Sequence, residues 1–361
     1  MIVSTELGRQ VASELQTIPQ LESIYVFCDN ISFHEEWTKT IPKVNGVYTD
    51  IKPISQALEI DREQCDRAMI SISFNGLDPL FMYTQLLKEA LLEIEDDDKI
   101  DIKALVDYCR EQDDIPEDQI TQVEREYHNH TPIWWYTAET FIGPMLNRGL
   151  RQMDVDIILK MGFFMRQLHN HISELHCEQQ DSVPEKFQVF RGQGLSMEDF
   201  ENIKKNETGL MSFNNFLSTS RNHKTSLENF ARPATKNLNS VGILFIMNID
   251  TNICAKSSTS FAEVSQVGYH QKQEEEILFT THTIFRIDHI ERLEDENTDR
   301  LWQVNLTIVG DDNHELNTLT AHIHEEFNSK ASRRGWSQVA FIFRKLGLKL
   351  KQFALVQTTY T

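Results

Sequence analysis

The chain has 361 residues and a formal net charge of −20. A charge of that sign repels a phosphate backbone or an anionic membrane surface, so nucleic acid and membranes are not expected as partners. Five scattered cysteines without CxxC spacing indicate reduced thiols.

The first twenty residues lack the basic start, apolar run and cleavage site of a secretory signal. No stretch reaches the roughly 18 consecutive apolar residues of a membrane span. We therefore expect a cytoplasmic protein. Export of a leaderless chain by dedicated machinery is the alternative that this pattern leaves open.

The first part of the chain alternates between short β-rich runs and polar, helix-compatible stretches. The β-rich runs are 22–28, 46–51 and 67–74, and their β-branched and aromatic residues are typical of strands. This alternation predicts a small α/β domain over residues 1–100. Its last element is a helix at 81–94, where apolar residues repeat at helical spacing.

The next segments differ sharply in composition. Residues 101–124 are strongly charged, which predicts a solvated linker rather than a core. Residues 131–176 have the composition of two or three packed helices, and short β-rich runs follow from Phe187 onward. We expect an α+β unit at 125–312, with a mostly antiparallel sheet behind a helical front.

The C-terminal tail, residues 313–361, contains basic amphipathic segments that predict one or two helices. A lone helical unit of this kind cannot bury its own apolar face. The tail is therefore expected to pack on the α+β unit or to bind another protein. The N-terminal domain is interpreted in the same way, as a folding module or a docking site for another protein.

Three short elements follow one another on expected strands of the α+β unit. In FRG, Arg191 lies on an apolar strand and Gly192 allows the backbone to approach a ligand closely. FLSTS is centred on Ser218. QEEEILF is an acidic triplet leading into an aliphatic strand, and the strand period of two places Glu274 and Glu276 on one face.

These residue types suit cleavage of a glycosidic bond in a dinucleotide. A cation would bind the pyrophosphate, a hydroxyl would orient the reacting groups, and a carboxylate would stabilise a developing oxocarbenium ion. The bond to nicotinamide is already activated by its cationic leaving group. No general acid and no metal are needed for this chemistry.

In the order of the motifs, their strand context and the paired glutamates, the chain resembles the arginine-specific mono-ADP-ribosyltransferases of the R-S-E class. The resemblance covers roughly residues 125–310, including the WYT and LNRGLR segments of the helical part. It implies the ADP-ribosyltransferase fold, a split, mostly antiparallel sheet with a helical front. It also implies transfer of ADP-ribose from NAD(P)⁺ to arginine side chains of proteins, with NAD⁺ as co-substrate and no metal.

The resemblance further implies a role for each motif residue. Arg191 would bind the NAD⁺ phosphates and Gly192 would offer its backbone to the nicotinamide amide. Ser218 would hold Glu276, which would bind the ribose 2′-hydroxyl and stabilise the oxocarbenium-like transition state. Glu274 would orient the acceptor guanidinium and take its proton, because a guanidinium is a poor nucleophile until it loses one.

Aromatic residues around these motifs receive expected positions as well. Phe230 is expected against the nicotinamide, in the cofactor-binding set with the other motif residues. The stretch 258–273 is expected to face the protein acceptor, with Phe261 and Tyr269 as contacts. The aromatic run 134–136 is interpreted as core.

Two other functions stay open at this point. One is an NAD⁺ glycohydrolase, in which water replaces the acceptor; the other is a catalytically silent binding or scaffold protein with the same fold. A metal site at His169 and His171 is disfavoured, because on a helix the two side chains face about 200° apart, whereas paired ligands usually lie at i and i+4.

Overall fold

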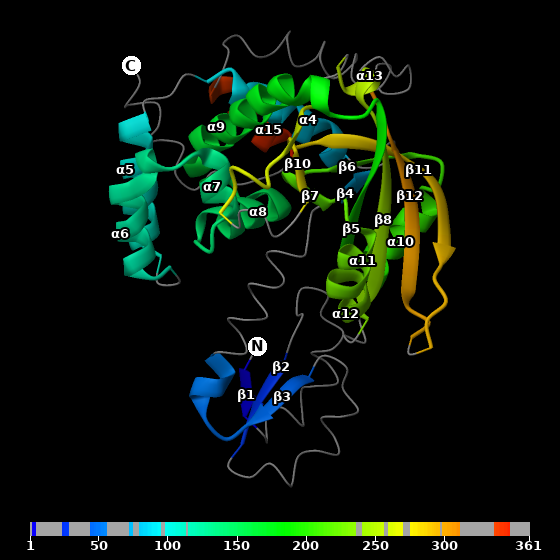
Figure 1. The fold of residues 1–361 in the computed structure, drawn as a ribbon. Coiled ribbons are helices and arrows are strands. Elements are labelled where there is room, and N and C mark those ends of the chain that lie inside the picture. Colours follow the sequence, from blue (N-terminus) through cyan, green and yellow to red (C-terminus); the bar gives the residue numbers. More distant parts are fainter. Residues whose placement is uncertain are drawn as a thin grey trace.

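The computed structural model describes residues 2–4, 24–28, 44–55, 72–74, 79–94, 98–112, 115–235, 240–255, 259–269, 275–296, 298–310 and 336–346. Its described strands form two sheets, one of three strands and one of nine (Figure 1).

The small sheet contains β1 (Ile2–Ser4), β2 (Ile24–Phe27) and β3 (Val44–Tyr48), all parallel. Its buried aliphatic residues form a cluster of their own. A helical segment at 51–55 follows β3. Parallel strands beside a helix agree with the α/β character predicted for the start of the chain.

The nine-stranded sheet has the order β4-β6-β11-β12-β8-β5-β7-β10-β9. All neighbouring strands are antiparallel except β12 and β8. The prediction of an α+β fold with a mostly antiparallel sheet is confirmed. Its strands are β4 (Ile72–Phe74), β5 (Lys186–Ser196), β6 (Leu210–Phe213), β7 (Leu217–Ser220), β8 (Ser240–Asp250), β9 (Phe261–Glu263), β10 (Glu276–Phe279), β11 (Thr283–Arg292) and β12 (Leu301–Ile308).

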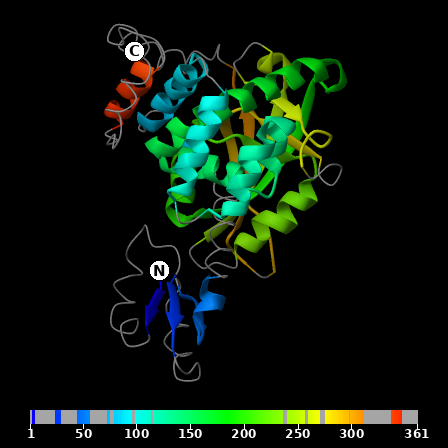
Figure 2. The same ribbon diagram turned by 90° about the vertical axis from the view of Figure 1, so that its left-hand side faces the viewer.

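A layer of helices covers the β7–β10–β9 end of this sheet (Figures 1 and 2). The layer contains α4 (Pro79–Leu92), α5 (Asp98–Arg110), α6 (Glu117–Glu126), η2 (Tyr127–Asn129), α7 (Pro132–Thr137), α8 (Ile142–Gln152), α9 (Val155–Gln179), η3 (Gln180–Ser182) and α15 (Trp336–Lys345). Shorter elements elsewhere are α10 (Met197–Lys205), α11 (His223–Thr225), the π-helical turn η4 (Ser226–Ala231), α12 (Arg232–Ala234) and α13 (Thr251–Cys254).

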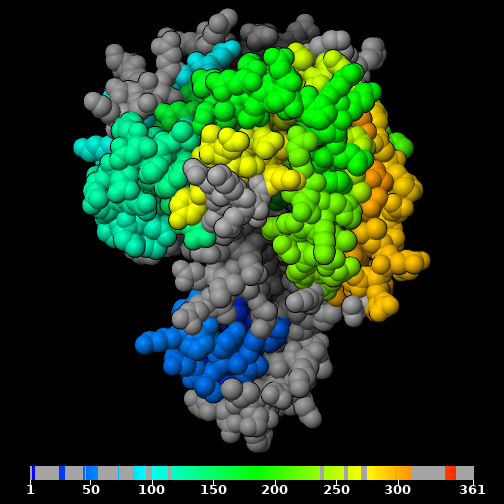
Figure 3. All heavy atoms as spheres, viewed as in Figure 1, coloured from blue at the N-terminus to red at the C-terminus, as the bar shows by residue number. Residues whose placement is uncertain are grey.

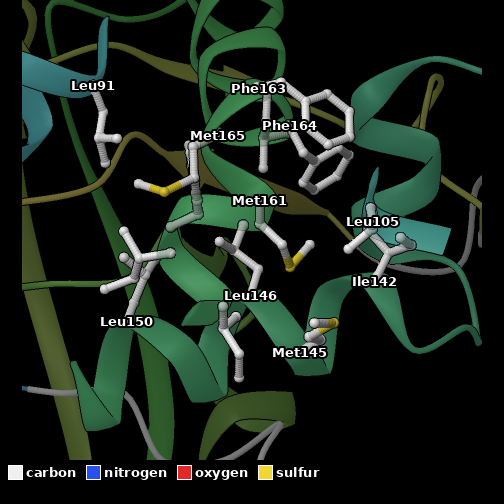
Figure 4. Packing of buried hydrophobic residues seen from close by; sticks show 14 of the residues in the cluster. Leu91, Leu105, Ile142, Met145, Leu146, Leu150, Met161, Phe163, Phe164 and Met165 are labelled. Carbon is white, nitrogen blue, oxygen red and sulfur yellow. The ribbon is translucent and has the colours of Figure 1, made fainter. Parts of the chain in front are cut away.

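Two hydrophobic cores lie on opposite faces of β7 and β10. Phe216 and Leu278 belong to the helical core, together with Met161 and Phe164 of α9 (Figure 4). Leu217 and the other alternate residues of these strands belong to a second core, which lies among the strands themselves. The period of two along a strand therefore assigns each residue to one core or the other.

Capping residues fix where the helices next to the sheet begin. Thr131 accepts a hydrogen bond from Trp134 N, and Pro132 occupies the first position of α7. Asp154 accepts bonds from two backbone N–H groups at the start of α9. Both caps set the phase of the helices that face the strands carrying the sequence motifs.

The prediction of a solvated linker at residues 101–124 is wrong. The segment lies largely within α5 and α6, and the apolar faces of both helices join the helical core. Leu105 and Cys109 are fully buried, as is Val123. The charged residues occupy the outer faces, where Arg110 bonds Glu124 at 2.6 Å.

β4 and α4 also lie differently from the expected small domain. β4 pairs with β6 at one edge of the large sheet, and α4 contributes Leu87 and Leu91 to the helical core. In the tail, α15 packs on α4 and buries Ile342 and Phe343 in the same core. This packing agrees with the expectation that the tail helix covers its apolar face against the α+β unit.

Two glycines allow the turn η4 to lie directly on the sheet. A Cβ atom at Gly192 would lie 1.8 Å from Ser226 O, and one at Gly242 would lie 2.1 Å from Ala231 O. Both contacts are with backbone, which cannot move aside as a flexible side chain can. Any side chain at these positions would push η4 away from β5 and β8.

Replacing Gly242 by alanine therefore tests this packing. We expect Gly242→Ala to lower the free energy of unfolding by about 3 kcal/mol, because overpacking forces backbone to shift. Urea unfolding followed by circular dichroism measures the change. Gly162→Ala is the matched control: its Cβ would meet only Leu91 Cδ2, at 3.4 Å, and alanine favours a helix interior by about 1 kcal/mol. Equal effects of the two changes would contradict the packing account.

Candidate active site

A cavity of about 270 Å³ opens between the helical layer and the strands β5, β7 and β10. Its described lining residues are Tyr136, Thr137, Ala138, Glu139, Gly143, Pro144, Asn147, Arg191, Phe216, Ser218, Val264, Ser265, Gly268 and Glu276. Arg191, Ser218 and Glu276 are among the residues that the sequence motifs identified. The fold thus brings one residue from each motif into a single cavity.

Ser218 and Glu276 meet across the β7–β10 pair. The register places Ser220 opposite Glu276 and Leu278 opposite Ser218, so Ser218 and Glu276 are diagonal neighbours on one face. Ser218 Oγ donates a hydrogen bond of 2.5 Å to Glu276 Oε1. The serine hydroxyl therefore holds one carboxylate oxygen at the cavity wall.

Arg191 reaches the same cavity from β5. β5 and β7 share the register pair Phe190 with Ser220. Arg191 Nη1 donates to Ser218 O at 2.7 Å, and Nε donates to Gln193 Oε1 at 2.9 Å. The guanidinium is fixed by two acceptors where the strands diverge.

Burial lowers the pKa of Arg191 to about 10, while the nearby Tyr136 and Glu276 act to raise it. The guanidinium therefore stays cationic at neutral pH. Among the described residues that line the cavity, Arg191 is the one cation. An anionic group of a ligand would be drawn to this position.

Tyr136 was interpreted as core; it packs against the helical core and also lines the cavity. Its hydroxyl lies 3.1 Å from Asn147 Oδ1 and 3.0 Å from Phe216 O, and its one proton can be donated to either acceptor. Asn215 is buried and donates to the same Asn147 oxygen at 3.1 Å. Burial raises the pKa of Tyr136 to about 12, so the hydroxyl stays protonated and keeps donating.

The remaining predicted site residues have different positions. Gly192 lies under η4, whose backbone fills the space that a side chain would need. Phe230 lies on η4 with 49% of its surface exposed, outside the cavity lining. Glu274 lies outside the described residues. The roles given to these three residues stay predictions.

The segment expected to face an acceptor is part buried and part exposed. Phe261 lies in β9 and is 2% exposed, within the strand core, so its expected contact with an acceptor is wrong. Tyr269 is exposed beside the cavity-lining Gly268, and its backbone N donates to Thr137 Oγ1 at 2.8 Å. Figure 3 shows residues 259–269 in yellow, lying against the green helix α9.

The described residues contain no group of three His, Cys, Asp or Glu side chains placed to hold a metal ion. His169 lies on α9, and burial lowers its pKa to about 4. The absence of a metal requirement stays a prediction. Within the same described residues, no helix is both long enough and apolar enough to cross a membrane.

No protein-family model and no curated protein matches the chain. Solved structures do match it. HopU1, an ADP-ribosyltransferase of Pseudomonas syringae pv. Tomato DC3000, is 16% identical, with 69% of this chain and 97% of that chain covered and a TM-score of 0.37. Exoenzyme S from Pseudomonas aeruginosa, in complex with human 14-3-3 protein beta and bound to Carba-NAD, is 19% identical. The match covers 57% of this chain and 88% of that chain, with a TM-score of 0.33.

The Clostridium limosum C3 exoenzyme is 13% identical, with 49% of this chain and 82% of that chain covered and a TM-score of 0.35. Identity and TM-score are low in each case. The chemistry of the cavity is therefore argued from its own residues.

Removing the guanidinium of Arg191 tests whether its buried charge destabilises the folded protein. At neutral pH the group is charged in both states, but burial disfavours the charged form in the fold, so the fold bears the full desolvation cost below pH 10. We expect Arg191→Met to leave the unfolding temperature unchanged or to raise it by up to about 3 °C. Calorimetry measures this.

The matched control is Arg232→Met. Arg232 is bonded to Glu228 and, at 2.8 Å, to Asp295, and its pKa is raised by these carboxylates. Its removal should lower the unfolding temperature. A larger loss of stability in Arg191→Met than in Arg232→Met would show that Arg191 is a structural residue.

Proposed function

We propose that the chain is a mono-ADP-ribosyltransferase that cleaves NAD⁺ at the nicotinamide glycosidic bond and transfers ADP-ribose to arginine side chains of proteins. The observation that carries the proposal is the convergence of Arg191, Ser218 and Glu276 on one cavity, with the serine hydroxyl bonded to the glutamate. A strand-borne cation, a hydroxyl and a partly buried carboxylate are the groups that this reaction requires. They lie on three strands of an α+β fold, as the resemblance to the R-S-E class implies.

Each group has a physical task in the cleavage step. The bond between ribose C1′ and the nicotinamide nitrogen breaks, and its electron pair leaves with neutral nicotinamide. Positive charge then develops on the ribose, and the carboxylate of Glu276 stabilises it. Ser218 Oγ bonds one carboxylate oxygen of Glu276, Oε1, and we assign the other oxygen to the ribose 2′-hydroxyl. Arg191 binds the pyrophosphate, which is the anionic part of the substrate.

Transfer to arginine needs a second carboxylate. A guanidinium nitrogen attacks C1′, and one proton must leave so that the ribosylated product is again a singly charged guanidinium. Glu274 precedes Glu276 by two residues, so in an extended strand its side chain would lie on the same face. We assign it to binding the acceptor guanidinium and taking that proton. This assignment makes arginine the acceptor and a protein with an exposed arginine the partner.

Glu276→Gln tests the cleavage step directly. The amide keeps the size of the side chain but removes the charge that stabilises the oxocarbenium ion. We expect nicotinamide release from NAD⁺ to fall by at least about a hundredfold, with and without the arginine mimic agmatine. Chromatography of released nicotinamide measures this.

Glu275→Gln is the control, because Glu275 is the exposed neighbour on the other face of the strand. It should keep wild-type activity. Nicotinamide release that survives Glu276→Gln would remove the basis of the proposal, as would a wild-type protein that releases none.

Glu274→Gln separates transfer from hydrolysis. We expect it to abolish formation of ADP-ribosylated agmatine and to leave part of the nicotinamide release, because only the acceptor step needs this carboxylate. Mass spectrometry of agmatine products, with nicotinamide measured in parallel, gives both rates. If the two rates fell equally, the division of roles between the two glutamates would be wrong. If the wild type released nicotinamide without modifying agmatine, the protein would be an NAD⁺ glycohydrolase.

A further inference from the structure

Gln193 is a buried amide immediately beside the proposed phosphate-binding cation. It follows Arg191 by two residues on β5, so both side chains project from the same face of the strand. Gln193 is 1% exposed and does not line the cavity. Any effect on a ligand in the cavity must therefore act through Arg191.

The amide is oriented by a single bond. Oε1 accepts from Arg191 Nε at 2.9 Å, and this bond fixes which end of the amide faces the guanidinium. In the described part of the chain, the buried Nε2 has no hydrogen-bond partner. An unpartnered buried donor destabilises a folded protein, so the Gln193 amide is not expected to stabilise the fold. What it does provide is an acceptor for Arg191.

Both described hydrogen-bond acceptors of Arg191 are neutral: the carbonyl of Ser218 and the amide of Gln193. A carboxylate can bind a guanidinium through two hydrogen bonds, which hold it firmly and also cancel its charge. At this position the neutral acceptors fix the geometry and add no further negative charge to that of nearby Glu276. Since Arg191 is the one cation among the described residues of the cavity wall, its charge has no substitute there.

We propose that Gln193 is a positioning residue for Arg191, one whose neutral amide holds the guanidinium in place without neutralising it, so that Arg191 binds the pyrophosphate of NAD⁺. This inference rests on the proposed function. It adds that the identity of residue 193, glutamine rather than glutamate, sets the affinity for the dinucleotide.

Gln193→Glu tests the requirement for a neutral acceptor. The carboxylate has the same shape and keeps an oxygen beside Arg191 Nε, but it neutralises the guanidinium. We expect the KM for NAD⁺ to rise about tenfold with kcat within about twofold of wild type, because the charge acts on binding and not on bond cleavage. Stabilisation of the folded protein by inorganic pyrophosphate, read as the shift in unfolding temperature, should be lost in parallel.

Two further variants complete the experiment. Gln188→Glu is the matched control, since it makes the same change on the same strand at an exposed position where the amide bonds only Asn248, at 2.9 Å. It should keep the wild-type KM. Gln193→Met removes the acceptor without adding charge, so it should raise KM through loss of positioning, and it serves as the test if Gln193→Glu does not fold.

The outcomes separate this inference from the function on which it rests. If the wild type neither cleaves NAD⁺ nor is stabilised by pyrophosphate, the proposed function fails and the inference with it. If the wild type is active and both position-193 variants keep its KM, the inference alone is overturned. If kcat fell in proportion to the fraction of the variant that is folded, while KM stayed constant, Gln193 would have only a structural role.

Discussion

The divergence of β5 from β7 is the constraint on which the candidate site depends. The two strands share one register pair, Phe190 with Ser220, and then separate. Beside this pair the guanidinium of Arg191 donates to the carbonyl of Ser218. Arg191 and Ser218 both line the cavity. The junction of the two strands therefore positions the cation at the cavity wall.

Packing on the opposite face of β5 holds the strand that carries Arg191 in a fixed position. There η4 packs on Gly192 and Gly242 without intervening side chains, and a small core containing Ala231 and Leu244 lies beneath it. Residues on a strand clamped from behind have little freedom to shift. Functional groups held to within about half an ångström need this kind of support, which loops do not provide. The cavity wall formed by β5 and β7 is thus built on regular elements.

The sequence was sufficient for the motif strands because each is β-rich and carries a polar or charged residue within or beside an apolar run. It was insufficient in the charged segment 101–124, where the acidic residues favoured a linker. The apolar residues of this segment nevertheless have the spacing of a buried helix face: Ile102, Leu105, Val106 and Cys109. Phe261 was misplaced for a different reason. Its strand is an edge strand, and only tertiary structure reveals that α9 covers it, with His176 Nδ1 2.9 Å from Phe261 O.

The net charge of −20 gives the neutral hydrogen-bond acceptors of Arg191 their importance. A strongly acidic surface attracts a cationic acceptor such as an arginine side chain and repels a dinucleotide with its two phosphates. The first effect assists transfer, whereas the second opposes binding of the co-substrate. A single cavity cation must then offset the repulsion, and it does so only if neighbouring groups do not neutralise it. Holding Arg191 with a carbonyl and an amide meets both demands, because neither acceptor adds negative charge where the phosphates would bind.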